Sequence, residues 1–417
     1  MPPGHRIRNA KCSLGPANEL LRATPRRCWT IPPLHCIMHG TRTECKTGAA
    51  QHNVNTTKAA QPLVRWLVRR LLYAALSFFF ITLVLYGGIM LVPAEARAQL
   101  YIPKGKGGVR APERIPKAIL LEIMKDHHLD EPYLVQYGYW IGGLFKGDWG
   151  YSQSLQEDVL QALLRRTPVT LELGLFSLLA FIPLGIWSGL LAGWRPHRLF
   201  DLAFRLTAHI GLSMPQFILA MLLLTVFYAK LRWLPPGRLD LLLELELERL
   251  AFPVYTGMLT IDGILSGRPD VSQNAIKHLI LPVFALSLYH WATLGRITRA
   301  LIMEERKKDY LLAARARGIP EARLIWRHGL PSIMAPSLTG IALSAASILT
   351  GVYVVEAIFL LNGVSRVIVK AMSYQPDAPA VLGFAVYSVL IVIVLMFILD
   401  VLQVLIDPRV REDTLNP

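Results

Sequence analysis

The sequence predicts an all-α polytopic membrane protein with six transmembrane helices, and three observations support this fold class. Of the 417 residues, 53% are hydrophobic and only 18% are charged, whereas about 25% are charged in a typical soluble domain. Mean hydropathy is +0.40. Six stretches are apolar over the roughly 20 residues that a helix needs to cross a bilayer. These values exclude a soluble fold, and they exclude disorder over most of the chain because disorder requires low hydrophobicity.

The first 62 residues differ from the rest of the chain. They have no helical or strand period and are rich in Pro, Gly, Asn, Thr and Arg. Region 1–62 is therefore predicted to be a basic, disordered cytoplasmic extension, or the product of a wrongly chosen upstream start codon. The four cysteines all lie here, at Cys12, Cys28, Cys36 and Cys45. Their spacing matches no zinc knuckle, so neither a metal site nor a disulfide-dependent fold is expected.

The first transmembrane helix is predicted over 63–94, with a charge-free core at 71–94. The next segment, 95–166, is predicted to be an external loop, and it is too long to be a simple connection. It is therefore expected to carry short structured pieces of its own. A helix is expected to start at Ile119–Met124, and the aromatic segment Tyr133–Phe145 is expected to lie on the membrane or dock on the helix bundle.

Region 167–411 is predicted to form a core domain with five further transmembrane helices, followed by a C-terminal tail at 412–417. The charge-free cores of these spans are 173–194, 206–229, 278–295, 328–355 and 378–399. Pro183 and Pro215 lie within two of the spans, where proline tends to kink a helix. Between the third and fourth spans, Leu241–Glu248 alternates Leu and Glu. A period of two favours a half-buried strand.

The formal charge of +15 sets the orientation. Residues 1–70 hold 12 basic and two acidic residues, 296–332 hold nine and four, and the remainder is neutral overall. Lys and Arg concentrate in alternate short loops, which places those loops and both termini in the cytoplasm. A basic protein can be a nucleic-acid binder, but here the charge reports topology. The expected surroundings are membrane lipid, with no nucleic-acid partner.

One cytoplasmic segment, 304–332, has an unusual pattern. Glu304–Arg317 is rich in helix formers, Gly318 suits a left-handed helix stop, and Pro320 suits the first turn of a second helix. This second helix is expected to be short, with Pro331 and Pro336 marking the return to the bilayer. A solvated basic loop would explain the charge. It would not explain the placement of Gly318 and Pro320, or an apolar Leu324-Ile325-Trp326 run in water. Apolar surface framed by charge is typical of a protein docking site.

The same segment resembles the EAA loop of binding-protein-dependent ABC transporter permeases. The matching residues are Tyr310-Leu-Leu-Ala313-Ala314-Arg315-Ala316-Arg317-Gly318 and, after nine residues, His328-Gly329-Leu330-Pro331. Leu312 stands where the general pattern has Glu, and His328 where it has Ile. With these two differences, the loop resembles the form found in the dipeptide/oligopeptide/nickel subfamily.

Further motifs extend this resemblance in colinear order over about 64–411. They are Glu131-Pro132-Tyr133-Leu134-Val135-Gln136-Tyr137, Gly147-Asp148-Trp149-Gly150-Tyr151-Ser152, Thr167-Pro168-Val169-Thr170-Leu171-Glu172-Leu173, Ser213-Met214-Pro215, Trp233-Leu234-Pro235-Pro236-Gly237, Val354-Val355-Glu356-Ala357-Ile358-Phe359, Asn362-Gly363-Val364 and Leu405-Ile406-Asp407-Pro408-Arg409-Val410-Arg411. Each is weak alone, and together they are specific. Region 1–62 has no counterpart in the family pattern.

The resemblance implies a type I ABC importer-like permease bundle in a cell inner membrane, importing peptides or peptide-like solutes, with nickel complexes as another cargo. The implied partners are two ABC ATPase subunits, a second permease subunit and an extracytoplasmic substrate-binding protein. The chain itself is expected to have no catalytic residue and no bound cofactor, since ATP is used by the partner subunits. Gly318–Trp326 would be the coupling helix. The residues implied in ATPase coupling are Tyr310, Ala313, Ala314, Ala316, Gly318, Ile319, Pro320, Leu324, Trp326, Leu330 and Pro331.

Four residues in or near the spans are candidates for lining the cargo pathway, because polar groups and kinks inside a membrane often mark function. They are Glu172, Pro215, His290 and Glu356. The structural alternative is a helix-end carboxylate for the two Glu residues and interhelical hydrogen bonding for the histidine.

Two other protein classes are the alternatives to an ABC permease. An intramembrane enzyme would need a nucleophile paired with a base, or a metal motif, and the spans contain neither. An ion-coupled secondary carrier usually shows internal repeats and carboxylates at mid-bilayer, and the sequence shows neither of these. ATP dependence of transport would separate both alternatives from the permease.

Overall fold

A computed structural model describes residues 56–99, 117–126, 128–250, 252–373 and 377–406. The chain divides into two units, Met1–Thr56 and Thr57–Pro417, and the helix bundle belongs to the second. Residues 1–55 of the predicted N-terminal extension, with the four cysteines, and the predicted tail at 412–417 lie outside the described residues. The last part of that extension, from Thr56 on, belongs to helix α1 (Thr56–Met90), so the predicted boundary at residue 62 is wrong.

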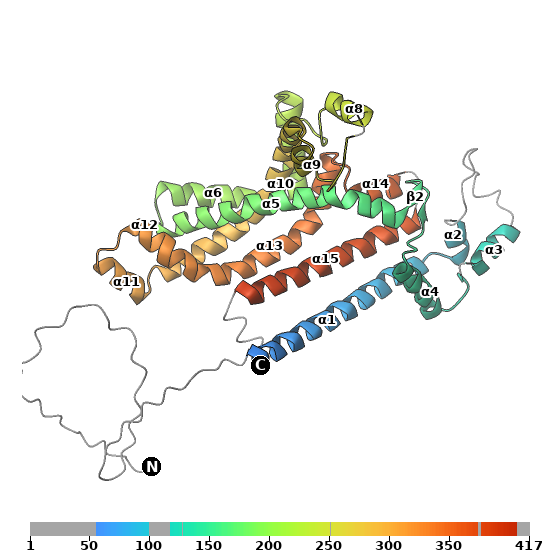
Figure 1. The fold of residues 1–417 in the computed structure, drawn as a ribbon, viewed down its shortest axis with the longest axis horizontal. Helices are drawn as coiled ribbons and strands as arrows, with labels where there is room; N and C mark the ends of the chain where they lie inside the picture. The colour runs from blue at the N-terminus through green and yellow to red at the C-terminus, as the bar shows by residue number, and fades with distance from the viewer. Residues whose placement is uncertain (1–55, 100–116, 127, 251, 374–376, 407–417) are drawn as a thin grey trace, which may run out of the picture. The chain divides into compact units, whose positions relative to one another are not determined.

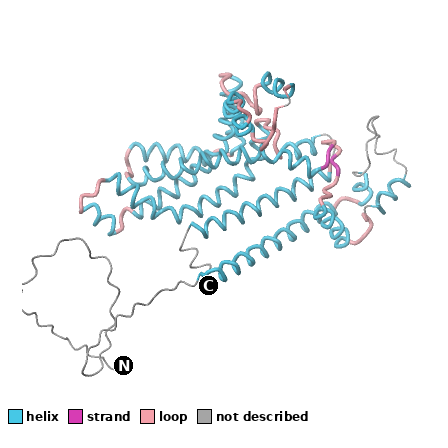
Figure 2. Tube along the Cα trace, in the orientation of Figure 1, coloured by secondary structure: helices cyan, strands magenta, loops and turns pink. Residues whose placement is uncertain are grey.

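The regular secondary structure of the described part is helical apart from one small hairpin, with loops and turns between the elements, as Figures 1 and 2 show. In this hairpin β1 (Tyr151–Ser152) pairs antiparallel with β2 (Glu157–Asp158). The helices in chain order, with the two π-helical stretches written η, are α1 (Thr56–Met90), α2 (Ala94–Gln99), α3 (Lys117–Asp126), α4 (Tyr133–Lys146), α5 (Val159–Trp194), α6 (Leu199–Ser213), α7 (Gln216–Leu223), η2 (Leu224–Lys230), α8 (Leu241–Arg249), α9 (Leu259–Leu265), α10 (Pro269–Glu305), α11 (Asp309–Ala316), α12 (Glu321–Arg323), η3 (Leu324–Gly329), α13 (Leu330–Ile358), α14 (Ser365–Ser373) and α15 (Ala378–Ile406).

Five helical stretches are long and apolar enough to cross a membrane. They coincide with five of the six predicted spans and are Arg65–Met90, Val159–Trp194, Pro269–Glu305, Glu321–Ile358 and Ala378–Val404. The multi-pass helical architecture expected from hydropathy is thereby confirmed for these five spans.

The third predicted span, 206–229, is bent. Helix α6 and the α7–η2 stretch meet at an angle of 102°. Pro215 causes the break, because it donates no backbone hydrogen bond and forces the preceding residue out of the helical region. Met214 accordingly has extended backbone angles, φ −98° and ψ 123°. Pro183, by contrast, lies inside α5 without interrupting it.

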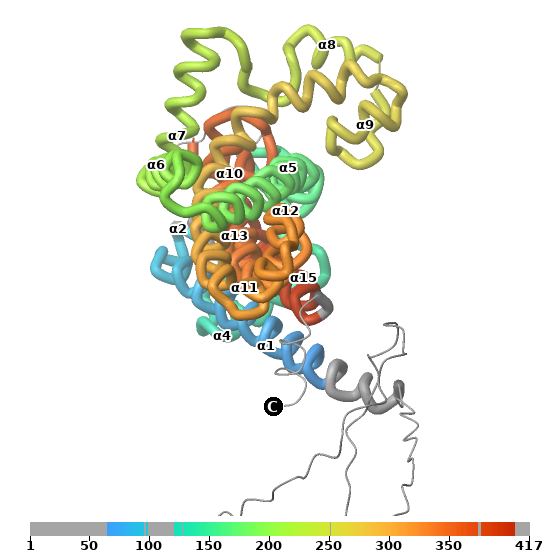
Figure 3. Tube along the Cα trace, turned by 90° about the vertical axis from the view of Figure 1, so that its left-hand side faces the viewer, coloured from blue at the N-terminus to red at the C-terminus, as the bar shows by residue number. Residues whose placement is uncertain are grey.

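Helices α5 and α10 form the most extensive helix pair and lie together at the centre of Figure 3. Gly185, Gly189 and Gly193 form a stripe on α5 that faces α10. A Cβ atom on Gly189 would lie 2.4 Å from the carbonyl oxygen of Gly295, and one on Gly193 would lie 2.2 Å from a methyl group of Ile302. Small residues at a spacing of four let two membrane helices approach this closely.

The main apolar core joins α5, α7, α10 and α13. Its fully buried members include Leu173 and Phe181 from α5, Leu286 and Leu294 from α10, and Val355 from α13. No disulfide takes part in this core, since all the cysteines lie before residue 46. Close side-chain packing between the helices therefore holds the bundle together.

Helices α1 and α4 pack on each other through aromatic rings. The Tyr133 hydroxyl donates to the carbonyl oxygen of Leu83, and the rings of Tyr86 and Trp140 stack with centroids 4.9 Å apart. The Tyr133–Phe145 segment therefore docks on the first transmembrane helix, which was one of the two placements expected for it. The expected helix start at Ile119–Met124 lies within α3.

The Leu–Glu alternation at Leu241–Glu248 forms helix α8, so the strand prediction is wrong. Leu and Glu are both strong helix formers. Leu247 alone is buried in this helix, and it packs with Val271 and Ala275 of α10. A helix that buries a single residue does not need apolar residues repeated every three or four positions. The alternation of Leu and Glu is therefore compatible with a helix here, although it is more typical of a strand.

Candidate functional site

The segment Asp309–Gly329 lies at one end of the bundle, between α10 and α13 (Figure 1). Helix α11 ends in a turn in which Gly318 has a φ of +75°, a left-handed conformation that favours glycine. The Ile319 N–H donates to the Ala314 carbonyl oxygen at 3.3 Å, and Pro320 then caps α12. The predicted helix, glycine turn and second helix are all present.

The second helix does not stop at the prolines, so that part of the prediction is wrong. Helical structure continues without a break from Glu321 to Ile358. Over η3 it widens, and the Leu330 N–H donates to the Ile325 carbonyl oxygen, five residues back. Pro331 follows directly after this π-helical stretch, at the start of α13, where the altered hydrogen-bond register accommodates a residue without an N–H.

A buried apolar cluster anchors the segment to the transmembrane helices. Leu311, Leu324 and Ile325 pack against Trp194 of α5 and Ile302 of α10. Other residues of the segment that are partly buried against the same cluster are Ala314, Ile319 and Leu330. The apolar Leu324-Ile325-Trp326 run is therefore not all in water as expected, since its first two residues are buried and Trp326 alone is exposed.

Polar contacts fix the two ends of the segment. The Tyr310 hydroxyl donates to Glu305 Oε1 at 2.7 Å and lies 3.0 Å from the hydroxyl of Ser332. Partial desolvation of the hydroxyl raises the pKa of the Tyr310 phenol. Lys308 pairs with the other oxygen of Glu305 at 2.6 Å, and this hydrogen bond raises the pKa of the Lys308 ammonium.

Glu321 connects the second helix to both of its neighbours. Its carboxylate accepts a hydrogen bond from the indole N–H of Trp194 at 2.5 Å and one from the Arg315 guanidinium at 3.0 Å. Arg306 donates to the carbonyl oxygen of Trp194 at 2.7 Å. The end of α5, the start of α12 and the α10–α11 turn are thereby held in one network.

The outward face of the segment is exposed and carries both apolar and basic residues, since Arg315, Arg317, Arg323 and Arg327 are exposed as well. Of the eleven residues predicted to be in the coupling site, Leu324 is buried and Ala314, Ile319 and Leu330 are half-buried. The exposed members are Tyr310, Ala313, Ala316, Gly318, Pro320, Trp326 and Pro331. A rigid, anchored element with an exposed face of small and aromatic residues is suited to binding another protein.

Glu172, one of the pathway candidates, is buried and fully engaged. Its carboxylate accepts hydrogen bonds from the backbone N–H and the hydroxyl of Thr260, at 2.9 and 2.7 Å, and pairs with Arg238 at 3.2 Å. It therefore ties α5 to the α9 region.

Glu356 is held in a similar way at the end of α13. It accepts hydrogen bonds from the Thr170 hydroxyl at 2.7 Å and from the Ser365 backbone N–H at 2.9 Å. A Cβ atom on Gly363 would collide with this carboxylate, so glycine is required there.

Pro215 lies at the bend between α6 and α7, and His290 of α10 contacts the residue that follows Pro215. Gln216, directly after the proline, has its amide nitrogen 3.2 Å from Nε2 of His290. The structure thus brings two of the four pathway candidates together, and it places Glu172 and Glu356 in separate inter-element networks.

Two further polar features are not among the residues predicted from the sequence. Arg238, the partner of Glu172, directly follows the Pro-Pro-Gly motif at 235–237. Buried Asp201 accepts from the Arg299 guanidinium at 2.6 and 3.1 Å and from the His197 backbone N–H at 3.0 Å. Asp201 lies between the predicted second and third spans and is the single acid of the otherwise basic stretch 195–205, a signal that could have indicated its pair with Arg299.

Comparisons with known proteins agree with one another. A family model described as "Binding-protein-dependent transport system inner membrane component" matches residues 182–412. The di/tripeptide transport system permease protein DppB of Pseudomonas aeruginosa is 31% identical over 351 residues, which is 84% of this chain and 99% of that protein. The probable D,D-dipeptide transport system permease protein DdpB of Escherichia coli is 35% identical over 315 residues, 74% of this chain and 89% of that protein. The oligopeptide transport system permease protein AppB of Bacillus subtilis is 28% identical over 350 residues, 84% of this chain and 100% of that protein.

Proposed function

The chain belongs to the family of binding-protein-dependent transport system inner membrane components, and from this premise we propose that it is a permease subunit of an ATP-driven peptide importer. It forms half of the translocation pathway, a second permease subunit forms the other half, and two ATPase subunits bind on the cytoplasmic side. A substrate-binding protein delivers the cargo from outside. ATP is hydrolysed in the partner subunits.

The observation that carries this proposal is the length of the similarity to permeases named for peptides. The relatives from Pseudomonas, Escherichia and Bacillus are aligned over 89–100% of their own length, so a whole transport subunit is matched. Their names refer to di/tripeptides, D,D-dipeptides and oligopeptides. Peptides are therefore preferred here over nickel complexes as the cargo.

The segment Asp309–Gly329 is the proposed docking site for an ATPase subunit. Three observations support this role. Its outward face is exposed, its buried face is fixed to α5 and α10, and its position between two spanning helices lets a force on it reach the bundle. Closure of the ATPase dimer on ATP would move Glu321 and, through Trp194, the end of α5.

The polar groups within the spans give no support to an ion-coupled carrier. Such a carrier needs a membrane carboxylate that can bind and release an ion. Glu172 and Glu356 already have two or three hydrogen-bond partners each. Their roles are therefore proposed to be structural.

Reconstitution tests the proposal directly. The chain is purified with the subunits that accompany it, placed in proteoliposomes with the binding protein, and supplied with a labelled dipeptide. Uptake is expected with ATP and is expected to be absent with a non-hydrolysable analogue. Peptide uptake by this chain alone, driven by an ion gradient, would contradict the proposal and favour the carrier.

A further inference from the structure

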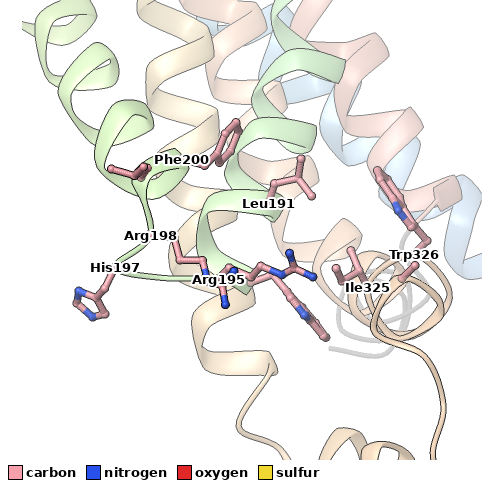
Figure 4. A pocket seen from close by; sticks show the side chains of 10 residues that line it. Leu191, Arg195, His197, Arg198, Phe200, Ile325 and Trp326 are labelled. Carbon is pink, nitrogen blue, oxygen red and sulfur yellow. The ribbon is translucent and has the colours of Figure 1, made fainter.

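A groove of about 800 Å³ lies between the α5–α6 loop and the second helix of the proposed docking segment, which contributes one of its walls (Figure 4). It is separate from the exposed face of α11 and from the pathway candidates. The volume lies within the usual range of small-molecule sites, about 300–1,000 Å³. The α5–α6 side of its lining includes Trp194, Arg195 and Arg198, and the docking-segment side includes Ala322 and Trp326.

The groove carries two cations that have no ion-pair partner among the described residues. Arg195 and Arg198 form no ion pair or side-chain hydrogen bond within this part of the chain. Asp201 is paired with Arg299 at 2.6 Å and Glu321 with Arg315 at 3.0 Å. Arg195 is near enough to Glu321 for its charge to act on that carboxylate, but the two form no ion pair. Figure 4 shows the two arginines close together on the loop. Two adjacent guanidinium groups are suited to bidentate binding of phosphate oxygens.

The rest of the groove is apolar and continues into an apolar surface. Leu199 and Phe200 at its edge are 85% and 46% exposed. Further along α6, an exposed row continues through Leu202, Leu206 and Ile210. These residues share one face of the helix, so a single molecule could place an anionic head between the arginines and a hydrocarbon chain along α6.

We propose that this groove binds one anionic phospholipid, with its phosphodiester between Arg195 and Arg198 and its acyl chains along the exposed face of α6. The site lies on the side of the membrane that the charge distribution predicts to be cytoplasmic, where basic pockets between helices bind anionic head groups. Trp194 and Trp326 also fit this level, since tryptophan is enriched at the membrane interface. An acidic segment of an ATPase subunit would satisfy the arginines but not the apolar row on α6.

The test compares lipid binding by the purified assembly containing the parent chain and two matched variants. Arg195→Gln/Arg198→Gln removes the two groove cations. Arg232→Gln/Arg249→Gln removes the same charge from exposed positions outside the groove. Binding is measured in detergent by native mass spectrometry and by the thermal shift on adding phosphatidylglycerol, phosphatidylcholine or inorganic phosphate.

Phosphatidylglycerol is expected to bind and stabilise the parent and the Arg232/Arg249 variant, and to bind the groove variant about tenfold or more weakly, because two charge-assisted hydrogen bonds are lost. Phosphatidylcholine and inorganic phosphate are expected to give little shift. Equal phosphatidylglycerol affinity in both variants would overturn the proposal. So would equal protection by inorganic phosphate, or loss of an ATPase subunit from the groove variant with lipid binding unchanged.

A second variant keeps the test decisive if the groove variant does not insert into the membrane. Ala322→Trp fills the groove and leaves both arginines in place. It is expected to lower phosphatidylglycerol binding about tenfold if the lipid enters the groove, whereas unchanged binding would contradict the proposed position.

Discussion

Gly318 has a backbone φ of +75°, and an added Cβ atom there would meet nothing within 4 Å. The position is open but conformationally demanding. A non-glycine residue in the left-handed region costs roughly 1–2 kcal/mol, and a β-branched residue is less tolerant still. This glycine therefore sets the angle between α11 and α12 without making any packing contact.

Replacing Gly318 with valine is expected to lower ATP-dependent peptide uptake at least tenfold while the amount of chain in the membrane stays unchanged. The reason is that the turn must relax to a negative φ, which displaces the face offered to the ATPase subunit. Uptake into membrane vesicles and immunoblotting of the membranes measure the two effects.

Gly267→Val is the matched control for this substitution. Gly267 has a φ of +68° and is equally open, but it lies in the turn between α9 and α10. Uptake by this variant is expected to remain within about twofold of the parent. Normal uptake by Gly318→Val, or equal losses in both variants, would remove the support for a specific coupling role.

The glycine turn and the second helix of the segment Asp309–Gly329 could be predicted from the sequence, but which of its residues face outward could not. The spacing of Gly318, Pro320 and Pro331 revealed the turn and the start of the second helix. In the π-helical stretch Leu324–Gly329, the side chains are spaced differently around the helix axis than in a regular α-helix. Leu324 and Ile325 consequently turn inward and Trp326 outward.

The α5–α10 pair depends on the glycine stripe at 185, 189 and 193. Gly189→Val is expected to separate these helices, since its side chain would overlap the backbone of Gly295 and the side chain of Thr298. Overpacking of this kind costs about 1–3 kcal/mol. The thermal unfolding temperature of the detergent-solubilised chain should fall clearly.

Gly174→Val is the control on the same helix, because a Cβ atom at Gly174 would meet nothing within 4 Å. Its unfolding temperature is expected to stay close to that of the parent. A similar fall in both variants would show that loss of a helix glycine, and not contact with α10, is responsible.

Helices that consist of long apolar runs could be predicted from the sequence. The size of the bend at Pro215 and the short helix α8 could not. Hydropathy alone located the five straight spans, because hydrocarbon thickness fixes their length. The 102° bend at Ser213–Met214–Pro215 depends on how α6 and α7 pack, so Pro215 indicated a kink but not its size. Helix α8 was missed because the period-two pattern outweighed the helix propensity of its residues.

Topology is a property of the whole molecule, and the cysteines provide a way to measure it. All four lie in the first 45 residues, so a membrane-impermeant maleimide reports on the N-terminal region alone. Labelling is expected in inside-out vesicles and not in intact spheroplasts, because the Lys and Arg distribution places this region in the cytoplasm.

A cysteine-free variant carrying Asp130→Cys is the complementary probe. Asp130 is exposed, between α3 and α4, in the loop predicted to be external. Its labelling should show the opposite pattern, with reaction in spheroplasts. The same labelling side for both probes would contradict the predicted orientation.

The unbroken helix from Glu321 to Ile358 makes two distant parts of the molecule mechanically dependent. At 1.5 Å per residue, its 38 residues span roughly 55 Å. Glu321 at one end is bonded to α5, and Glu356 at the other holds the backbone of Ser365. The helix thus links contacts at its two ends, and the π-helical stretch Leu324–Gly329 lies close to the Glu321 end. If an ATPase subunit docks on Asp309–Gly329 as proposed, a displacement of Glu321 would be carried along this helix toward Glu356 and Ser365.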